Sequence, residues 1–386
     1  MPFSATRLRA AAAVAGLAAV TVVATGPPAV ASAFAEGDRL YISNGGSDTA
    51  AANIARFGIG ADGRVALAET VPVKTSASGL VFTSDLGAHG QRFAYASAEN
   101  GIDSYRVGSG GELSFVDSTP APEPFGIAIS PRGPTVFVAH LESRSVSAFH
   151  VEPTGRLTLV NTVDSGAIHP KGVAVTPDGR FVYVVHGTPR APEPTPTILT
   201  GFAVGVDGSL SGPITKAPIG PSGHRVVITP DGRFLYATMQ EAGDTGDVYG
   251  FRIGSSGRLT PVSAKPFEAG VWVEGAAVTP DGRRLYVDSL GIVGGDPTPV
   301  ADGQVSGFDI GADGRLTEVA QVDYGLDPND LAVGLDGRHL YVGDFSGDTV
   351  GVFSINPTGA LGLLQTTPSG GVGPSYQGVT VQPRGN

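Results

Sequence analysis

Short apolar stretches separated by turn residues recur along this chain at intervals of roughly fifty residues. The clearest copies read TPDGRFVYVV at 176–185, TPDGRFLYAT at 229–238 and TPDGRRLYVD at 279–288. In each copy Pro-Asp-Gly indicates a tight turn, because Pro presets φ and Gly accepts a positive φ. The β-branched and aromatic run that follows is typical of a strand. A period of this length is typical of repeat architectures.

Two sets of aromatic residues follow the same repeat. A turn glycine recurs seven times, and an aromatic residue stands six positions before each one: Phe57, Tyr105, Phe149, Phe202, Phe251, Phe308 and Phe353. A second aromatic lies upstream in every unit: Tyr41, Tyr95, Phe137, Tyr183, Tyr236, Tyr286 and Tyr341. Such regular placement predicts a repeated packing role for the aromatic side chains.

One unit contains four strand-like segments and no helical period. In the fourth unit these are 172–176, 180–185, 198–204 and a segment that begins at Leu210. Seven such units predict an all-β fold, a seven-bladed β-propeller of four-stranded antiparallel blades. The segment 38–43 reads as a second strand without a first, and 378–385 as a first strand without a second. We therefore expect strands from both termini to close the first blade, which would cover two sheet edges.

The N-terminal segment has the features of a secretory signal peptide. Arg7 and Arg9 precede an apolar run at 10–24, and an Ala-rich tail leads to Ala35. The run is short for a membrane span, which needs about 20 residues, so we expect no stable membrane insertion. We predict cleavage after Ala35, with Ala33 as the alternative, and hence a secreted protein whose residues 36–386 form a single propeller domain.

Composition narrows the possible partners. The formal net charge is −11 and no basic cluster is present, which disfavours nucleic acid as a partner. The chain has no cysteine, so stability must come from packing and from closure of the fold. We expect a monomer.

The inner strands predict a candidate site where they begin, at one mouth of the central channel. Counting back from each Pro-Asp-Gly equivalent gives Ser78, Phe125, Lys171, His224, Glu274, Asn329 and Gln377. Arg225 and Asp330 stand next to this ring, at positions that are glycine in the other units. Converging titratable groups could bind a small polar or anionic ligand and move protons. The alternative is a set of solvated residues around a water-filled channel.

The candidate residues divide into two roles. We expect His224, Arg225 and Glu274 to be catalytic, and Lys171, Trp272, Asn329 and Asp330 to bind substrate. Trp272 could pack at the rim or stack on a ring-shaped ligand. The links 186–197 and 289–304 are long and differ between units, as binding loops on a rigid scaffold often do. The remaining histidines, including His140 and His186, are expected at turns or on the surface.

The repeats resemble those of the lactonase-type seven-bladed propellers, a family that includes 6-phosphogluconolactonase and carboxymuconate-lactonizing enzymes. The resemblance is carried by the three TPDG segments, by GLDGRHLYVG at 334–343, and by the GRLT turns at 155, 257 and 314. It implies a site of His, Arg and acidic residues at this mouth. Here Lys171 replaces a His, His224 and Arg225 stand in reversed order, and Asn329 replaces an Arg.

The acidic position of the family falls on Gly275, one residue after Glu274. Because a shift of one residue turns a strand side chain to the opposite face, a bulge at Trp272–Val273 would decide whether Glu274 reaches the channel.

Two functions remain open at this stage. The first is a secreted lactonase-like enzyme that hydrolyses or isomerises a small lactone at the channel mouth. The second is a non-catalytic extracellular propeller that binds a glycan, a peptide or a cell-wall component. The sequence has no zinc-binding spacing, P-loop or Gly-x-Ser-x-Gly motif, so we expect no metal and no cofactor.

Overall fold

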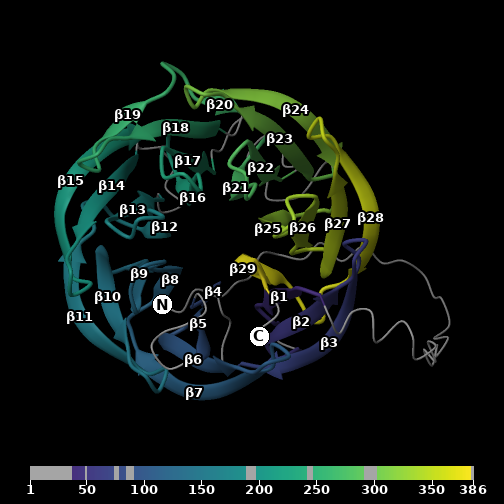
Figure 1. Cartoon of the computed structure of the whole chain (residues 1–386), viewed down its shortest axis with the longest axis horizontal. Helices are drawn as coiled ribbons and strands as arrows, with labels where there is room; N and C mark the ends of the chain where they lie inside the picture. Colours follow the sequence, from purple (N-terminus) through teal and green to yellow (C-terminus); the bar gives the residue numbers. More distant parts are fainter. Residues whose placement is uncertain are drawn as a thin grey trace.

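Seven sheets stand around a central axis in the computed structural model (Figure 1). The structure describes residues 37–47, 50–73, 78–83, 91–187, 197–240, 247–290 and 302–383. The predicted signal peptide at 1–35 and most of both long links lie outside these residues. We number the sheets as blades one to seven in chain order, with blade one formed by β29, β1, β2 and β3. The predicted seven-bladed propeller is confirmed.

Each blade runs from an inner to an outer strand. The inner strands are β29 (Pro374–Gln382), β4 (Gly79–Phe82), β8 (Pro124–Ile129), β12 (Pro170–Val175), β16 (Gly223–Ile228), β21 (Val273–Val278) and β25 (Pro328–Val333). The second strands are β1 (Arg39–Asn44), β5 (Arg92–Ala98), β9 (Thr135–His140), β13 (Phe181–His186), β17 (Phe234–Met239), β22 (Arg284–Ser289) and β26 (His339–Asp344). The third strands are β2 (Asn53–Ile59), β6 (Gly101–Val107), β10 (Ser145–Val151), β14 (Thr197–Val204), β18 (Asp247–Ile253), β23 (Gln304–Ile310) and β27 (Thr349–Ile355).

The outer strands are β3 (Val65–Pro72), β7 (Leu113–Pro120), β11 (Leu157–Asp164), β15 (Leu210–Ile219), β24 (Leu316–Asp323) and β28 (Leu361–Pro368), with β19 (Leu259–Pro261) and β20 (Phe267–Glu268) in blade five. Blade five departs from the expected four strands, because both short segments pair with β18. Pro261 and Pro266 flank the interruption, and proline has no N–H to donate to a ladder.

Strands from both ends of the chain close blade one, as predicted. β29 pairs antiparallel with β1, and Val381 lies opposite Leu40 while Val379 lies opposite Ile42. The two strands lie side by side in Figure 1, in the yellow and purple of the chain ends. β29 begins at Pro374, four residues earlier than the sequence pattern indicated.

The Thr-Pro-Asp-Gly turn is held by its own side chains. In blade four, Thr176 Oγ1 donates to Asp178 Oδ1 at 2.6 Å, and the same Asp oxygen accepts the main-chain N–H of Arg180. Blades five and six repeat both contacts. The repeat therefore keeps Thr and Asp because each closes the hairpin between the first and second strands.

A tyrosine hydrogen bond crosses six of the seven seams between blades. The second-strand tyrosine of one blade donates its hydroxyl to the carbonyl of the turn glycine in the next blade. The pairs are Tyr41–Gly111 at 2.7 Å, Tyr95–Gly155 at 3.1 Å, Tyr183–Gly257 at 2.8 Å, Tyr236–Gly314 at 2.8 Å, Tyr286–Gly359 at 2.9 Å and Tyr341–Gly63 at 3.1 Å. Blade three has Phe137 at this position and lacks the hydroxyl. The two aromatic and glycine repeats of the sequence are thus parts of one inter-blade contact.

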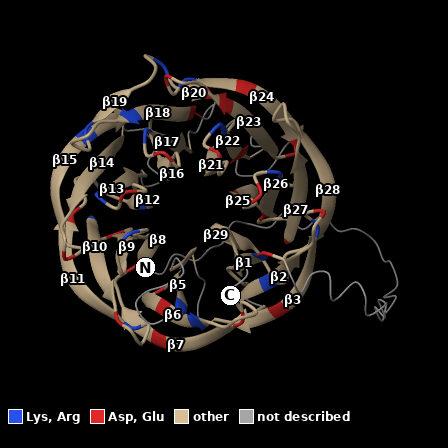
Figure 2. Ribbon diagram, viewed as in Figure 1, with Lys and Arg blue, Asp and Glu red and all other residues tan. Residues whose placement is uncertain are grey.

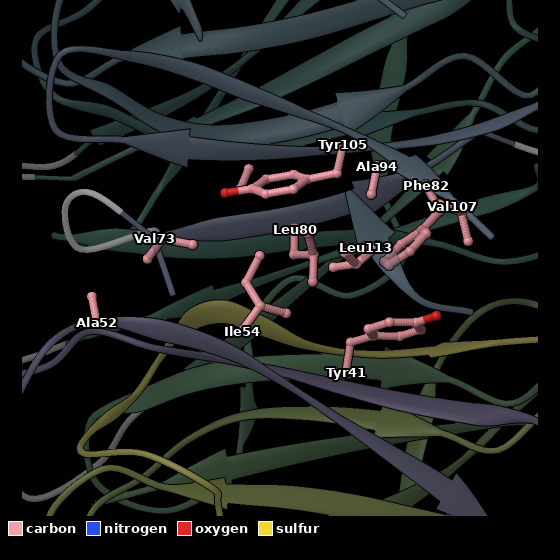
Figure 3. Close-up of a cluster of buried hydrophobic side chains, with 11 residues drawn as sticks. Tyr41, Ala52, Ile54, Val73, Leu80, Phe82, Ala94, Tyr105, Val107 and Leu113 are labelled. Atoms are coloured by element: carbon pink, nitrogen blue, oxygen red, sulfur yellow. The ribbon is translucent and has the colours of Figure 1, made fainter. Parts of the chain in front are cut away.

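The hydrophobic core is divided among the seams. Each cluster of buried apolar side chains takes residues from two neighbouring blades. Figure 3 shows the cluster between blades one and two, where Tyr41 and Ile54 of blade one face Leu80 and Phe82 of blade two across the seam. Because every blade buries both faces against a neighbour, no blade has a complete core of its own.

Charged residues are mixed around the ring rather than gathered on one side (Figure 2). Such a mixture produces no strong field of a single sign. In the part of the chain that the structure describes, we find no helix with the length and apolar character needed to cross a membrane.

We predict that Tyr236→Phe lowers the free energy of unfolding by about 1 kcal/mol, because the buried Gly314 carbonyl loses its donor while ring packing is kept. Urea denaturation followed by fluorescence measures the change. An unaltered unfolding midpoint would show that the seam hydrogen bond contributes nothing to stability.

Candidate functional site

A repeated β-bulge shapes the start of the inner strands. In blades three to six the register with the second strand shifts at the same place, so two inner-strand residues lie opposite one partner. The bulged pairs are 125–126, 171–172, 224–225 and 274–275. A bulge of this kind re-aims a side chain. In blade six the strand does bulge, at 274–275 and not at Trp272–Val273, and Glu274 is fully buried in this bulge.

The residue two places before each bulge adopts a left-handed conformation. These residues are Glu123, His169, Ser222 and Trp272, with φ of 39°, 51°, 57° and 56°. The carbonyl of each accepts an N–H from the end of the second strand, such as that of Gln240 on Ser222 at 2.8 Å. Trp272 is half-buried at this turn position. Its predicted contact with substrate is not tested by this geometry and stays a prediction.

Gln240 joins the charged residues of blades four and six. Its side-chain carbonyl accepts from Lys171 Nζ at 3.0 Å, and its side-chain amide donates to Glu274 Oε1. The main-chain carbonyl of Glu274 accepts from Thr238 Oγ1 at 2.8 Å and lies 3.3 Å from His224 Nδ1. The structure thus brings Lys171, His224 and Glu274 into one network, through a residue that sequence reasoning missed.

An ion pair crosses from blade five to blade seven. Arg225 Nη2 lies 3.6 Å from Asp330 Oδ1, with side-chain exposures of 21% and 1%. Asp330 Oδ2 accepts the N–H of Val379 in blade one at 2.9 Å. Burial raises the pKa of Asp330, and the Arg225 guanidinium opposes that rise. Both residues replace glycines of the other blades, and they meet over Gly275, where a Cβ would lie only 3.0 Å from Asp330 Cα.

A third buried carboxyl group, that of Asp288, completes this cluster. Its side chain is fully buried and its Oδ1 accepts the N–H of Gly275 at 2.7 Å. Burial is the main cause that raises the pKa of Asp288 well above its ordinary value; Glu274 and Asp330 add to the rise, whereas Gly275 N–H and Arg225 oppose it. One sequence signal could have identified Asp288. The corresponding second-strand positions of the other six blades hold only uncharged residues: Ser43, Ser97, Ala139, Val185, Thr238 and Gly343.

Three rings from three blades meet across the channel. The Phe125 and His224 rings are 6.3 Å apart, His224 and Tyr376 are 5.0 Å apart, and Phe125 and Tyr376 are 6.2 Å apart. In blade one the channel residue is therefore Tyr376 and not only the predicted Gln377. The reason is a longer bulge, since residues 375–378 lie between the β29 residues that face Asn44 and Ile42.

Other predicted residues take structural positions. Asn329 is buried, and its Nδ2 donates to the carbonyl of Pro374 at 2.8 Å, which ties blade seven to blade one. The expectation that His140 and His186 lie at turns or on the surface was wrong, because both are buried at the ends of second strands. His140 Nε2 lies 2.7 Å from Ser147 Oγ, within blade three. Burial lowers the pKa of His186 to about 4.

Among the residues with a described placement, no group of His, Asp and Glu is arranged to hold a metal ion. The functional groups available are thus a half-buried arginine, a lysine, a buried histidine and three buried carboxyl groups, next to an aromatic surface. They can bind an anion and exchange protons.

Comparison with known protein families gives the same family that the sequence repeats resemble. The family described as "Lactonase, 7-bladed beta-propeller" matches residues 123–190 and 263–376, just under half of the chain. The predicted resemblance is confirmed: the chain is a seven-bladed propeller that is similar to this lactonase family. No curated protein matches it by sequence.

Solved structures agree on the fold. A putative 6-phosphogluconolactonase from Bacteroides uniformis has a TM-score of 0.72 at 17% identity, over 90% of this chain and 99% of that one. One from Bacteroides fragilis has a TM-score of 0.70 at 17% identity, over 90% and 98%. A periplasmic gluconolactonase from Pseudomonas aeruginosa has a TM-score of 0.68 at 22% identity, over 90% and 99%. At such low identity these likenesses show the fold alone.

We predict that Arg225→Met destabilises the fold by about 3 kcal/mol at neutral pH, because Asp330 stays buried without its cation. The loss should shrink as the pH falls and Asp330 becomes protonated. Adding Asp330→Asn should recover most of the loss, as measured by urea denaturation. A double variant no more stable than the single one would contradict the pairing.

Proposed function

We propose that this protein is an exported lactonase-like enzyme that acts on a small lactone with an anionic or polar substituent. The observation that carries the proposal is the hydrogen-bond network that joins Lys171, His224 and Glu274 from three consecutive blades, with Arg225 next to His224 in the same bulge. The family match and the lactonase names of the solved relatives support the same reaction class.

The roles follow from the chemistry of ester cleavage. A base, either His224 or Glu274, takes a proton from a water molecule while the oxygen of that water bonds to the lactone carbonyl carbon. The carbonyl oxygen becomes negative, and the Arg225 guanidinium stabilises that charge. The ring C–O bond then breaks and the protonated base returns its proton to the leaving oxygen. The same base could instead take a proton from the carbon next to the carbonyl, which would give isomerisation.

The side chains next to the base and Arg225 bind the substrate. Lys171 holds a carboxylate or phosphate, and Asp330 fixes Arg225 by the ion pair. Phe125 and Tyr376, both half-buried, offer a surface for the apolar face of the lactone ring. Trp272 lies in the turn before β21, and Asn329 lies in β25, where it donates to the carbonyl of Pro374.

A panel of sugar and dicarboxylate lactones tests the assignment. We expect Glu274→Gln or His224→Asn to lower kcat/KM by about 10²–10⁴-fold for the variant that removes the base. We expect Lys171→Met to raise KM mainly for lactones with a charged substituent. Glu318→Gln, at an exposed outer-strand position, is the matched control and should leave turnover unchanged.

Two results would overturn the proposal. Turnover that all three site variants leave unaltered would place the chemistry elsewhere. A folded protein that binds a glycan or peptide without turning over any lactone would favour the non-catalytic propeller.

We also propose that residues 1–35 direct export and are then removed. The basic head, apolar run and Ala-rich tail support this. When the full chain is produced in a bacterial host with a general secretion pathway, mass spectrometry of the exported protein should give Glu36 as its first residue. Protein that keeps Met1 and stays inside the cell would contradict export.

A further inference from the structure

The residue opposite each bulge can act as a side-chain clamp. In blade five this residue is Thr238, whose hydroxyl accepts the N–H of Arg225 at 3.0 Å. The same hydroxyl donates to the main-chain carbonyl of Glu274 in the next blade at 2.8 Å. In blade two, Ser97 pairs with Gly79 and likewise donates to the carbonyl of Phe125 in blade three at 2.9 Å. In blade five the clamp thus supplies one acceptor for the bulge and one donor for the neighbouring blade.

Asp288 occupies the clamp position in blade six. Its Oδ1 accepts the N–H of Gly275, the counterpart of Arg225 in the bulge. Its Oδ2 has no hydrogen-bond partner among the described residues. A Cβ built on Gly275 would lie 2.2 Å from this oxygen and 3.0 Å from Asp330 Cα, so Oδ2 lies near the start of β25 in blade seven. In blades two and five the side chain at this position supplies a donor, and an ionised carboxylate has none.

We propose that Asp288 is a neutral carboxylic acid in the folded protein at neutral pH, and that it donates its proton to the main-chain carbonyl of Asn329. One oxygen then holds the bulge that carries Glu274, and the other ties blade six to blade seven. Asp288 is thus a positioning residue of the mouth, with no direct contact to substrate. This inference does not depend on lactone turnover.

The surrounding charges favour the neutral form. Glu274 and Asp330 both disfavour a third negative charge, and Arg225 is already paired with Asp330 at 3.6 Å. The bond from Gly275 N–H favours ionisation, but burial is the larger influence on the pKa of Asp288. Protonation of Asp288 leaves Glu274 and Asp330 as the acidic groups beside the cationic Lys171 and Arg225.

The pH dependence of stability tests the proposal through Asp288→Asn. Above about pH 4, where Asp in the unfolded chain is ionised, folding of the natural protein takes up one proton at Asp288. Its folding constant therefore falls tenfold per pH unit from this group until the pKa of the buried acid is reached. The Asn side chain keeps an acceptor and a donor and takes up no proton. We expect the ratio of folding constants, variant over natural protein, to rise about tenfold per pH unit above pH 4.

The same experiment distinguishes a neutral Asp288 from an ionised one. If Asp288 is ionised in the folded protein, folding takes up no proton above pH 4 and the ratio will be constant there; a constant or falling ratio overturns the proposal. Glu318→Gln, the exposed control, should give a constant ratio. Asp288→Ala should lose stability at every pH, and Asp288→Thr, which copies blade five, should recover it. If the Asn variant does not fold, the Thr variant provides the same pH test.

A spectroscopic measurement provides an independent reading. At neutral pH, the infrared spectrum of the natural protein should contain a carboxylic-acid C=O band that Asp288→Thr lacks. Identical spectra in this region would overturn the proposal. Both measurements are made without substrate, so a negative result would not bear on the proposed lactonase activity, and absence of that activity would not bear on the protonation of Asp288.

Discussion

The pairing of β29 with β1 is the interaction on which the rest of the structure depends. A propeller blade has no complete core of its own, so the chain is stable only when every seam is filled. The antiparallel contacts of Leu40 with Val381 and of Ile42 with Val379 supply the inner strand of blade one. The hydrogen bond from Tyr341 to Gly63 then fastens blade seven to blade one, as five other tyrosines do elsewhere. Closure thus replaces the disulfides that this chain lacks.

The closed ring also creates the candidate site, because its charged residues come from separate blades. Lys171 and Glu274 lie on blades four and six and are joined through Gln240 of blade five. Arg225 and Asp330 come from blades five and seven, and Asp330 also binds the main chain of β29. Such a site can be assembled only when neighbouring blades pack at their seams, which the tyrosine–glycine contacts cross. The stability of the fold and the candidate site therefore share one constraint, which is the geometry of the seams.

The fold could be predicted from the sequence because its signals are local and repeated. Pro-Asp-Gly turns, the strand tyrosine and the turn glycine each recur at a fixed offset, and each has a defined contact in the structure. The site was harder to predict. Counting along inner strands located Lys171, His224, Glu274 and Asp330, but the bulges depend on pairing with the second strand. Gln240 and Asp288 belong to that second strand or its end, so no count along the inner strand reaches them. Tyr376 was missed because the bulge of blade one is longer than the others.

Native-state hydrogen exchange tests the central claim, that closure of blade one holds the whole ring, most directly. If the ring opens only by global unfolding, the paired amides of β29 should exchange at the slow rate of the amides in β12 and β16, on the opposite side of the channel. The three strands should also accelerate together as urea is added. Amides of β29 that exchange by a separate, low-energy opening while β12 and β16 stay protected would contradict the account, because the ring would then persist without its closing strand.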